Sequence, residues 1–357
     1  MSPLAALPGV LTSKQVSDTA ASLAALQLPS GQIPWFPGGH CDPWNHVESA
    51  MALVVGGRVA EAHRAFEWLE SLQHDDGGWH NYYVGADNDI EDARRDTNVC
   101  TYVAVGAWHH YLVTGDRGFL ESVWPMVVKA IEFALRLQRP GGQIIWAYDY
   151  DGEPETYALL TGSSSIFLSL RCALAAATVL GDEQRLAPWE AAAARLGSAV
   201  AHRPDTAFEP KRRWAMDWYY PVLCGAVGGA VGQARMDDRW DEFVIEGFGI
   251  RCVSDASWVT ASETAECVLA LDACGRTDQA RTLMTWVQYL REPDGSYWTG
   301  CVHPEEIHFP ADERTSYTAA VMLLASDALG RLTPASGLFR GESLPTVEVE
   351  PTLATDR

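Results

Sequence analysis

The stretch Leu72-Gln73-His74-Asp75-Asp76-Gly77-Gly78-Trp79 contains a pattern that recurs along this chain. It combines the apolar end of a helix, a glutamine, a glycine turn and a tryptophan. Glycine lets the chain turn where a helix ends, the glutamine can bond freed backbone groups, and the tryptophan can wedge between neighbouring elements. Such a recurring unit indicates a repeat architecture. The other copies are Leu26-Gln27…Gly31…Trp35, Leu137-Gln138…Gly141-Gly142…Trp146 and a degenerate Leu290-Arg291…Gly295…Trp298.

Two kinds of helical segment alternate around these repeats. One kind is rich in Ala, Val and Leu and nearly uncharged after its first turn, which predicts a helix buried on most sides. These segments are 43–56, 97–114, 163–180, 218–231, 258–274 and 315–329. The other kind is amphipathic and predicts a half-exposed helix. These segments are 13–28, 59–73, 118–138, 183–201, 236–245 and 277–291.

The alternation predicts an all-α fold, an (α/α)6 toroid of inner and outer helices. The segment 13–28 comes first in the chain and can supply the outer partner of the last inner helix, which closes the ring. No linker or low-complexity run interrupts the pattern, so we expect residues 1–331 to form a single catalytic domain. Residues 332–357 contain several Pro, Thr and acidic residues and predict a C-terminal extension or a disordered tail.

The charge and cysteine content of the chain indicate which kinds of binding partner and which cellular compartment to expect. Lys plus Arg number 26 against 47 Asp plus Glu, a net charge of −21, which disfavours nucleic acid and anionic membranes. We find no stretch that is long and apolar enough to span a membrane, and the N-terminus lacks the basic and then apolar residues of a signal peptide. The eight scattered cysteines indicate reduced core thiols, so we expect a cytoplasmic protein without a disulfide framework. The oligomeric state stays open.

The loops that lead into the inner helices of such a ring line one mouth. Before the first inner helix, Asp42 is a good N-cap residue with Pro43 at the first helical position. In the fifth inner helix, Glu263 and Glu266 interrupt an otherwise apolar sequence. A buried carboxylate there is costly unless it faces a polar cavity. Glu263 lies nearer the mouth and is therefore preferred.

The entrances together supply aromatic and acidic side chains, which suit sugars because sugar faces stack on rings while hydroxyls bond carboxylates. We predict that Asp42 and Glu263 act as the acid and base of a glycoside hydrolase. Which is the acid, whether the anomer is retained or inverted, and endo or exo action stay open. No metal or cofactor is expected. The predicted substrate-binding residues are Trp35, His40, Trp44, Asn45, His46, Glu48, Asp96, Trp146, Tyr148, Asp149, Asp217, Trp218 and Trp258.

Several motifs resemble those of known families. The glutamine–tryptophan repeats resemble the QW motifs of squalene cyclase and protein prenyltransferase toroids. The stretches 110–146 and 258–296 are more similar to glucoamylase-type glycosidases. With the motifs at 36–48 and 258–266, the whole chain resembles the actinobacterial prenyltransferase-like family that includes mycobacterial methylmannose polysaccharide hydrolases. That resemblance implies an endomannosidase that cleaves internal α-(1→4) linkages of 3-O-methylmannose polysaccharide in the cytoplasm.

Two alternatives remain. An isoprenoid enzyme (a prenyltransferase or a terpene cyclase-like protein) needs an Asp-rich acid or a zinc site. Here Asp149-Tyr150-Asp151-Gly152 lacks the paired terminal Asp, and Asp96…Cys100 and Cys301-Val302-His303 form no convincing zinc signature. A non-catalytic glycan-binding toroid would keep the aromatic residues but would not place two carboxylates across one cleft.

Overall fold

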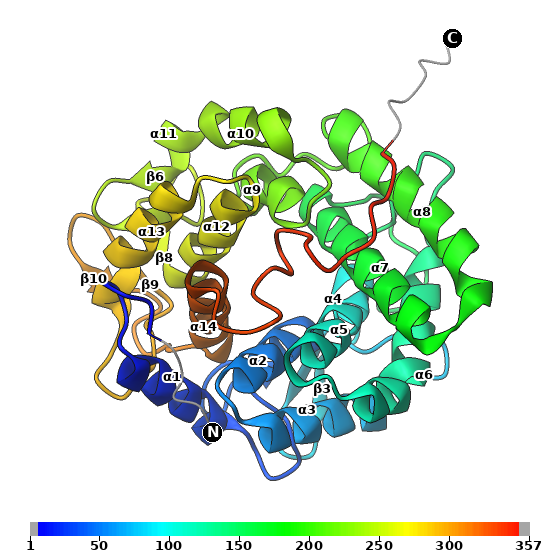
Figure 1. The fold of residues 1–357 in the computed structure, drawn as a ribbon, viewed down its shortest axis with the longest axis horizontal. Helices are drawn as coiled ribbons and strands as arrows, with labels where there is room; N and C mark the ends of the chain where they lie inside the picture. The colour runs from blue at the N-terminus through cyan, green and yellow to red at the C-terminus, as the bar shows by residue number, and fades with distance from the viewer. Residues whose placement is uncertain (1–5, 350–357) are drawn as a thin grey trace.

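The computed structural model describes residues 6–349 and shows a mostly helical fold (Figure 1). The helices are α1 (Ser13–Leu26), α2 (Pro43–Val55), α3 (Val59–Leu72), α4 (Thr97–Thr101), α5 (Val103–Thr114), α6 (Arg117–Leu135), α7 (Leu160–Leu180), α8 (Glu183–His202), α9 (Met216–Leu223), α10 (Gly229–Asp238), α11 (Trp240–Phe243), α12 (Ala261–Ala273), α13 (Thr277–Trp286), the 3-10 helix η1 (Val287–Leu290) and α14 (Ser316–Gly330). The strands are β1 (His40–Cys41), β2 (Tyr82–Val84), β3 (Asp89–Asp92), β4 (Arg95–Asp96), β5 (Ala147–Tyr148), β6 (Val244–Ile245), β7 (Gly249–Arg251), β8 (Trp258–Thr260), β9 (Gly300–Val302) and β10 (Ile307–His308).

Figure 1 shows helices around a common centre, with a second set outside them. The inner helices contact one another in the order α2, α5, α7, α9, α12, α14 and back to α2, which is a closed circle. Outside them lie α1, α3, α6, α8, α10 and α13. The inner helices are almost wholly buried, which explains why their sequences are apolar on nearly every side.

The glutamine of each repeat joins two outer helices. Its side-chain amide donates to the carbonyl of its own glycine turn and to a carbonyl of the following outer helix. Gln73, for example, donates to Gly77 and to Met126 of α6, at 3.0 Å in both cases. Gln27 bonds Gly31 and Glu61 of α3, and Gln138 bonds Gly142 and Ala192 of α8. In the degenerate repeat, Arg291 donates to Gln15 of α1 and so links the last repeat to the first helix.

The turn glycines are required by shape as well as by conformation. Gly142 has φ +94°, and a Cβ there would collide with the backbone carbonyl of Arg195 in α8. The corresponding Gly77 and Gly295 meet the backbones of α6 and α1 in the same way. A side chain would therefore push neighbouring outer helices apart.

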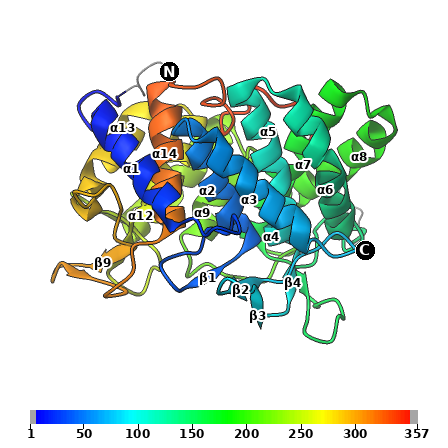
Figure 2. The ribbon, with the colours of Figure 1, turned by 90° about the horizontal axis from the view of Figure 1, so that it is seen from below.

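The short strands lie at one end of the helices, as Figure 2 shows. β1, β4 and β8 run directly into α2, α4 and α12, so the first turns of these helices share that end. The strands form antiparallel sheets with the orders β1-β2-β3, β4-β5 and β10-β9-β8-β7-β6. The expectation of an all-α fold missed them because each strand is only two to four residues long.

The boundaries around the fourth inner helix differ most from the sequence prediction. The fourth inner helix, predicted at 218–231, ends at Leu223 because Gly225 has φ +75° and turns the chain outward. The outer helix that follows therefore begins at Gly229 instead of near residue 236.

Helix α7 corrects the expectation that no stretch could span a bilayer. Among the described residues it is the one helix that is long and apolar enough by length and composition. Most of its side chains are buried against neighbouring helices, so packing in the core accounts for its apolar character.

The segment after α14 packs against the end of the ring opposite the strands (Figure 2). Leu338 and Phe339 are buried, and Arg340 forms an ion pair with the buried Asp272 of α12 at 2.6 Å. Residues 332–349 are thus attached to the helices, and residues 350–357 of the predicted tail lie outside the described residues.

Substituting a turn glycine tests the role of the repeats. We expect Gly142→Ala to lower the free energy of unfolding by about 2 kcal/mol or more, because it combines backbone strain with a steric clash. Gly115→Ala is the matched control, since Gly115 also has positive φ but has open space around it. Urea denaturation measures both, and equal losses would contradict this role of the turn.

Candidate active site

A cavity of about 310 Å³ opens among the first turns of the inner helices, at the end where the strands lie. The inner helices α2, α7, α9, α12 and α14 contribute to its wall, and the short helix α4, which directly precedes α5, contributes in place of α5. The lining residues are Trp35, Asp42, Trp44, Asn45, Glu48, Asn81, Tyr82, Asn98, Val99, Thr161, Met216, Tyr220, Ser262, Glu263, Glu266 and Tyr317. None of these lining residues is a lysine, an arginine or a histidine.

Asp42 is the N-cap of α2, as the sequence predicted. Its Oδ1 accepts from the backbone N–H of Asn45 at 2.9 Å, and Pro43 occupies the first helical position. Its Oδ2 accepts from the indole of Trp35 and from the amide of Asn45, both at 2.7 Å. The carboxyl is 3 % exposed and burial raises its pKa, while the donated hydrogen bonds oppose that rise.

Glu263 lies in the first turn of α12 and faces the same cavity. Ser262 donates to one of its carboxylate oxygens at 2.7 Å, and the thiol of Cys252 donates to the other at 3.2 Å. Trp35, which donates to Asp42, packs edge-on against Tyr317, and both aromatic residues line the cavity with Glu263. The structure therefore brings the two predicted catalytic carboxyls to one cavity.

A second pair of carboxyls lies one turn deeper. Glu266 accepts hydrogen bonds from the phenols of Tyr219 and Tyr220 of α9. Burial and the neighbouring Glu263 raise the pKa of Glu266 to about 8. Glu48 of α2 is 3 % exposed and has no hydrogen-bond partner among the described residues. Burial, followed by the charges of Glu266 and Asp42, raises the pKa of Glu48 well above its usual range.

The buried carboxyls of this cavity have no lysine, arginine or histidine among the lining residues to stabilise their ionised forms. Carboxylates that crowd together away from water cannot all ionise at neutral pH. The raised pKa values of Glu48 and Glu266 fit such crowding, and a group that keeps its proton near neutral pH can act as a general acid. Among residues 6–349, no group of three or more His, Cys, Asp or Glu could hold a metal ion. All eight cysteines are buried and free of disulfides.

Of the predicted substrate-binding residues, Trp35, Trp44, Asn45 and Glu48 line the cavity. His40 lies just outside, stacked on Tyr82 and paired with Glu91 at 2.8 Å. His46 does not reach the cavity, because its two ring nitrogens face the Ile33 N–H and the Ala65 carbonyl inside the protein.

The residues predicted from the loops before the second and third inner helices do not line the cavity. Asp96 is the N-cap of α4 and also accepts from the indole of Trp146, so both are engaged with each other. Tyr148 packs on Phe133, and Asp149 closes its own turn by accepting from two backbone N–H groups. Burial raises the pKa of Asp96 to about 6.

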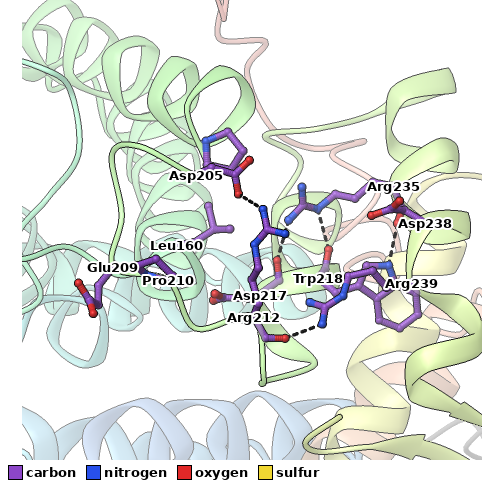
Figure 3. Close-up of a pocket in the computed structure, with 11 residues that line it drawn as sticks. Leu160, Asp205, Glu209, Pro210, Arg212, Asp217, Trp218, Arg235, Asp238 and Arg239 are labelled. Carbon is purple, nitrogen blue, oxygen red and sulfur yellow. Dashed lines mark hydrogen bonds and ion pairs between the residues drawn. The ribbon is translucent and has the colours of Figure 1, made fainter.

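Trp258, predicted from the fifth entrance, packs on Phe309 and donates to its carbonyl at 2.9 Å. Asp217 and Trp218 line a different hollow of about 160 Å³, which Figure 3 shows between the loop after α8 and helix α10. Trp218 is 1 % exposed and stacks on Phe243, so it is a core residue.

In the hollow of Figure 3, the carboxyls of Asp205 and Asp217 are engaged by neighbouring side chains, and those of Glu209 and Asp238 lie at exposed positions. Asp205 is paired with Arg212 at 2.6 Å, and Asp217 accepts from Thr161 at 2.7 Å. Arg235 donates to the backbone carbonyls of Asp217 and Trp218. Its groups thus hold α9 and α10 together, and the central cavity is the candidate active site.

Sequence reasoning missed several lining residues because they bear no catalytic signature. The sequence favours Glu263 over Glu266, and the structure places both on the wall. Position along the helix could have identified them, because the missed residues on inner helices lie within the first two turns of those helices. The lining residues not predicted are Asn81, Tyr82, Asn98, Val99, Thr161, Met216, Tyr220, Ser262, Glu266 and Tyr317.

The raised pKa of Glu266 makes a prediction about stability. The folded protein holds this proton up to about pH 8, whereas the unfolded chain releases it near the usual value of 4.5, so folding becomes less favourable as pH rises between them. Glu266→Gln stays neutral. We expect the free energy of unfolding of the variant, relative to wild type, to rise by up to about 1.4 kcal/mol per pH unit across that window.

Urea denaturation between about pH 5 and about pH 8 measures this difference. Glu190→Gln, which removes one exposed carboxyl from α8, is the matched control measured over the same range. A pH-independent difference for Glu266→Gln would show that the carboxyl is ionised throughout.

No protein-family model matches the chain. Solved structures share its fold. A glycosidase in complex with glucose has a TM-score of 0.70 at 17 % identity, covering 89 % of this chain and 97 % of that one. A D-mannose isomerase has a TM-score of 0.65 at 11 % identity, covering 89 % and 96 %. At these identities the likeness concerns the fold alone.

One curated relative is much more similar. It is the MMP endo-(1,4)-3-O-methyl-α-D-mannosidase of Mycolicibacterium hassiacum, 51 % identical over 339 residues, which cover 95 % of this chain and 92 % of the relative. The resemblance to the mycobacterial hydrolase is confirmed, whereas the wider likeness to squalene cyclases stays an expectation. With this identity over nearly the whole length, the chain belongs to the family of the MMP endo-(1,4)-3-O-methyl-α-D-mannosidase.

Proposed function

We propose that this protein is an (α/α)6 toroid that hydrolyses internal α-(1→4) linkages of 3-O-methylmannose polysaccharide. Asp42 and Glu263 divide the roles of acid and base between them. The observation that carries the proposal is that both carboxyls line one cation-free cavity of a chain that belongs to a mannosidase family. The closed circle of contacts among the inner helices supports the toroid.

The reaction needs a proton for the leaving oxygen and a carboxylate that activates water or attacks the anomeric carbon. Asp42 is fixed by Trp35 and Asn45, while Glu263 is fixed by Ser262 and Cys252. Groups held in this way require little reorganisation when the bond breaks. The two carboxyls come from helices on either side of α14 and so approach the cavity from different directions.

Sugar rings would be held by the aromatic side chains on the wall. Trp35 and Tyr317 contact each other edge-on, and Trp44 stacks on Tyr102 at 4.1 Å, so these rings are rigid platforms. Glu48, which is buried and unpartnered, would bond a sugar hydroxyl. A methylated sugar is less polar than its parent, which suits a wall with this aromatic content.

We further propose that residues 1–331 act as one catalytic unit and that the protein works in the cytoplasm. Its eight free cysteines support a reducing compartment.

Hydrolysis of a defined substrate tests the function. Purified, EDTA-treated protein is incubated with methylmannose polysaccharide and, separately, with plain α-oligosaccharides, and products are read by mass spectrometry. We expect shorter methylated oligomers whose lengths show internal cleavage. Binding of the polysaccharide without cleavage would instead identify a glycan-binding protein, and recovery of activity only on adding metal would contradict a purely carboxylate mechanism.

Removing either carboxyl tests the residue assignment. We expect Asp42→Asn and Glu263→Gln each to lower kcat/KM by roughly 10²–10⁴-fold, the usual range for a lost acid or base. The matched controls are Asp278→Asn and Glu190→Gln, which change exposed carboxyls on outer helices. Near-normal turnover by a folded Asp42→Asn or Glu263→Gln variant would remove that residue from catalysis.

A further inference from the structure

The wall of the cavity has two chemically different halves. Asp42, Glu263 and Tyr317 lie on α2, α12 and α14, and α14 contacts both of the other helices. Val99, Thr161 and Met216 lie on α4, α7 and α9, and α7 contacts both of the others. The lining carboxyls at the helix N-caps and first turns therefore share one half of the ring. In the other half Asp96 and Asp217 occupy such positions, but neither lines the cavity: Asp96 accepts from the backbone N–H of Val99 and Asp217 from the hydroxyl of Thr161.

These side chains lie at one level of the cavity. Each belongs to the first turn of its helix or to its N-cap: Met216 is the first residue of α9, Thr161 the second of α7 and Val99 the third of α4. Asp42 is the N-cap of α2, and Glu263 is the third residue of α12. A sugar unit positioned against the carboxyls would therefore meet the neutral half on its other side.

The neutral half has little free hydrogen-bonding capacity. Val99 and Met216 offer aliphatic surface and are only partly buried, so apolar surface remains open to the cavity. Thr161 has its hydroxyl proton engaged, since it donates to Asp217 at 2.7 Å. The exception is Asn98, whose buried side-chain oxygen has no partner and can accept from a sugar hydroxyl beside Val99.

We infer that Val99 and Met216 form the subsite that receives the 3-O-methyl group of a mannose unit and selects methylated over unmethylated chains. A free hydroxyl placed against this surface would lose its water partners without gaining new ones, whereas a methyl ether buries apolar area. This inference rests on the proposed function and deepens it by assigning the specificity to named side chains.

The test compares two substrates, a 3-O-methylated α-(1→4)-mannooligosaccharide and its unmethylated counterpart of equal length. Val99→Thr exchanges one methyl for a hydroxyl at nearly constant shape, and Met216→Gln replaces an apolar thioether end with a polar carboxamide at similar length. We expect each variant to lower the ratio of kcat/KM (methylated over unmethylated) by about tenfold, as expected when one methyl contact is lost. Val231→Thr, an exposed valine on α10, should leave the ratio unchanged.

The outcomes separate the inference from the function. Variants that cleave both substrates with the wild-type ratio would overturn the methyl subsite and leave the hydrolase intact. Equal loss on both substrates would assign the two residues a structural role and also overturn the subsite. If the wild-type protein cleaves neither substrate, the proposed function fails and the subsite fails with it.

Discussion

The pair of hydrogen bonds donated by each repeat glutamine is the constraint on which the rest of the structure depends. Gln138 bonds its own turn and the next outer helix, at 3.0 and 2.9 Å, so one side chain fixes both the end of a helix and its neighbour. Repeated from α1 through α3 and α6 to α8, with Arg291 joining the last repeat to α1, this contact fixes the relative height of these outer helices. Because the heights agree, the first turns of the inner helices meet at one level.

That common level has a chemical consequence. Side chains at equivalent positions of different helices converge, so Asp42 and Glu263 reach one cavity although 221 positions separate them in the sequence. The same geometry places Glu48 and Glu266 together one turn deeper. Burial and mutual repulsion raise the pKa of Glu48 and of Glu266, which supports the acid–base chemistry proposed for this cavity.

The sequence predicted the features that depend on local patterns. The alternation of apolar and amphipathic segments anticipated the inner and outer helices, and the N-cap signature of Asp42 with Pro43 was confirmed. The repeat glutamines were expected to bond backbone groups at helix ends, and they do. The same pattern did not reveal their second bond, because the carbonyl it reaches belongs to another helix.

The residues that line the cavity were harder to predict for a related reason. Asp96, Asp149 and Trp218 have the right chemistry, but local partners occupy them: a helix cap, a turn and the Phe243 ring. Conversely, Val99 and Met216 look like core residues in sequence and lie on the cavity wall. Composition of an entrance loop identifies the kind of site, whereas the orientation of each side chain depends on contacts made across the ring.

A crystal structure of the Glu263→Gln variant with a 3-O-methylated α-(1→4)-mannotetraose tests the central claim most directly. The account predicts an oligosaccharide that crosses the central cavity, with a glycosidic oxygen or anomeric carbon within about 3.5 Å of the carboxyl of Asp42 and of the residue 263 side chain. An oligosaccharide held only in the hollow between the loop after α8 and α10, with the central cavity free of sugar, would contradict it.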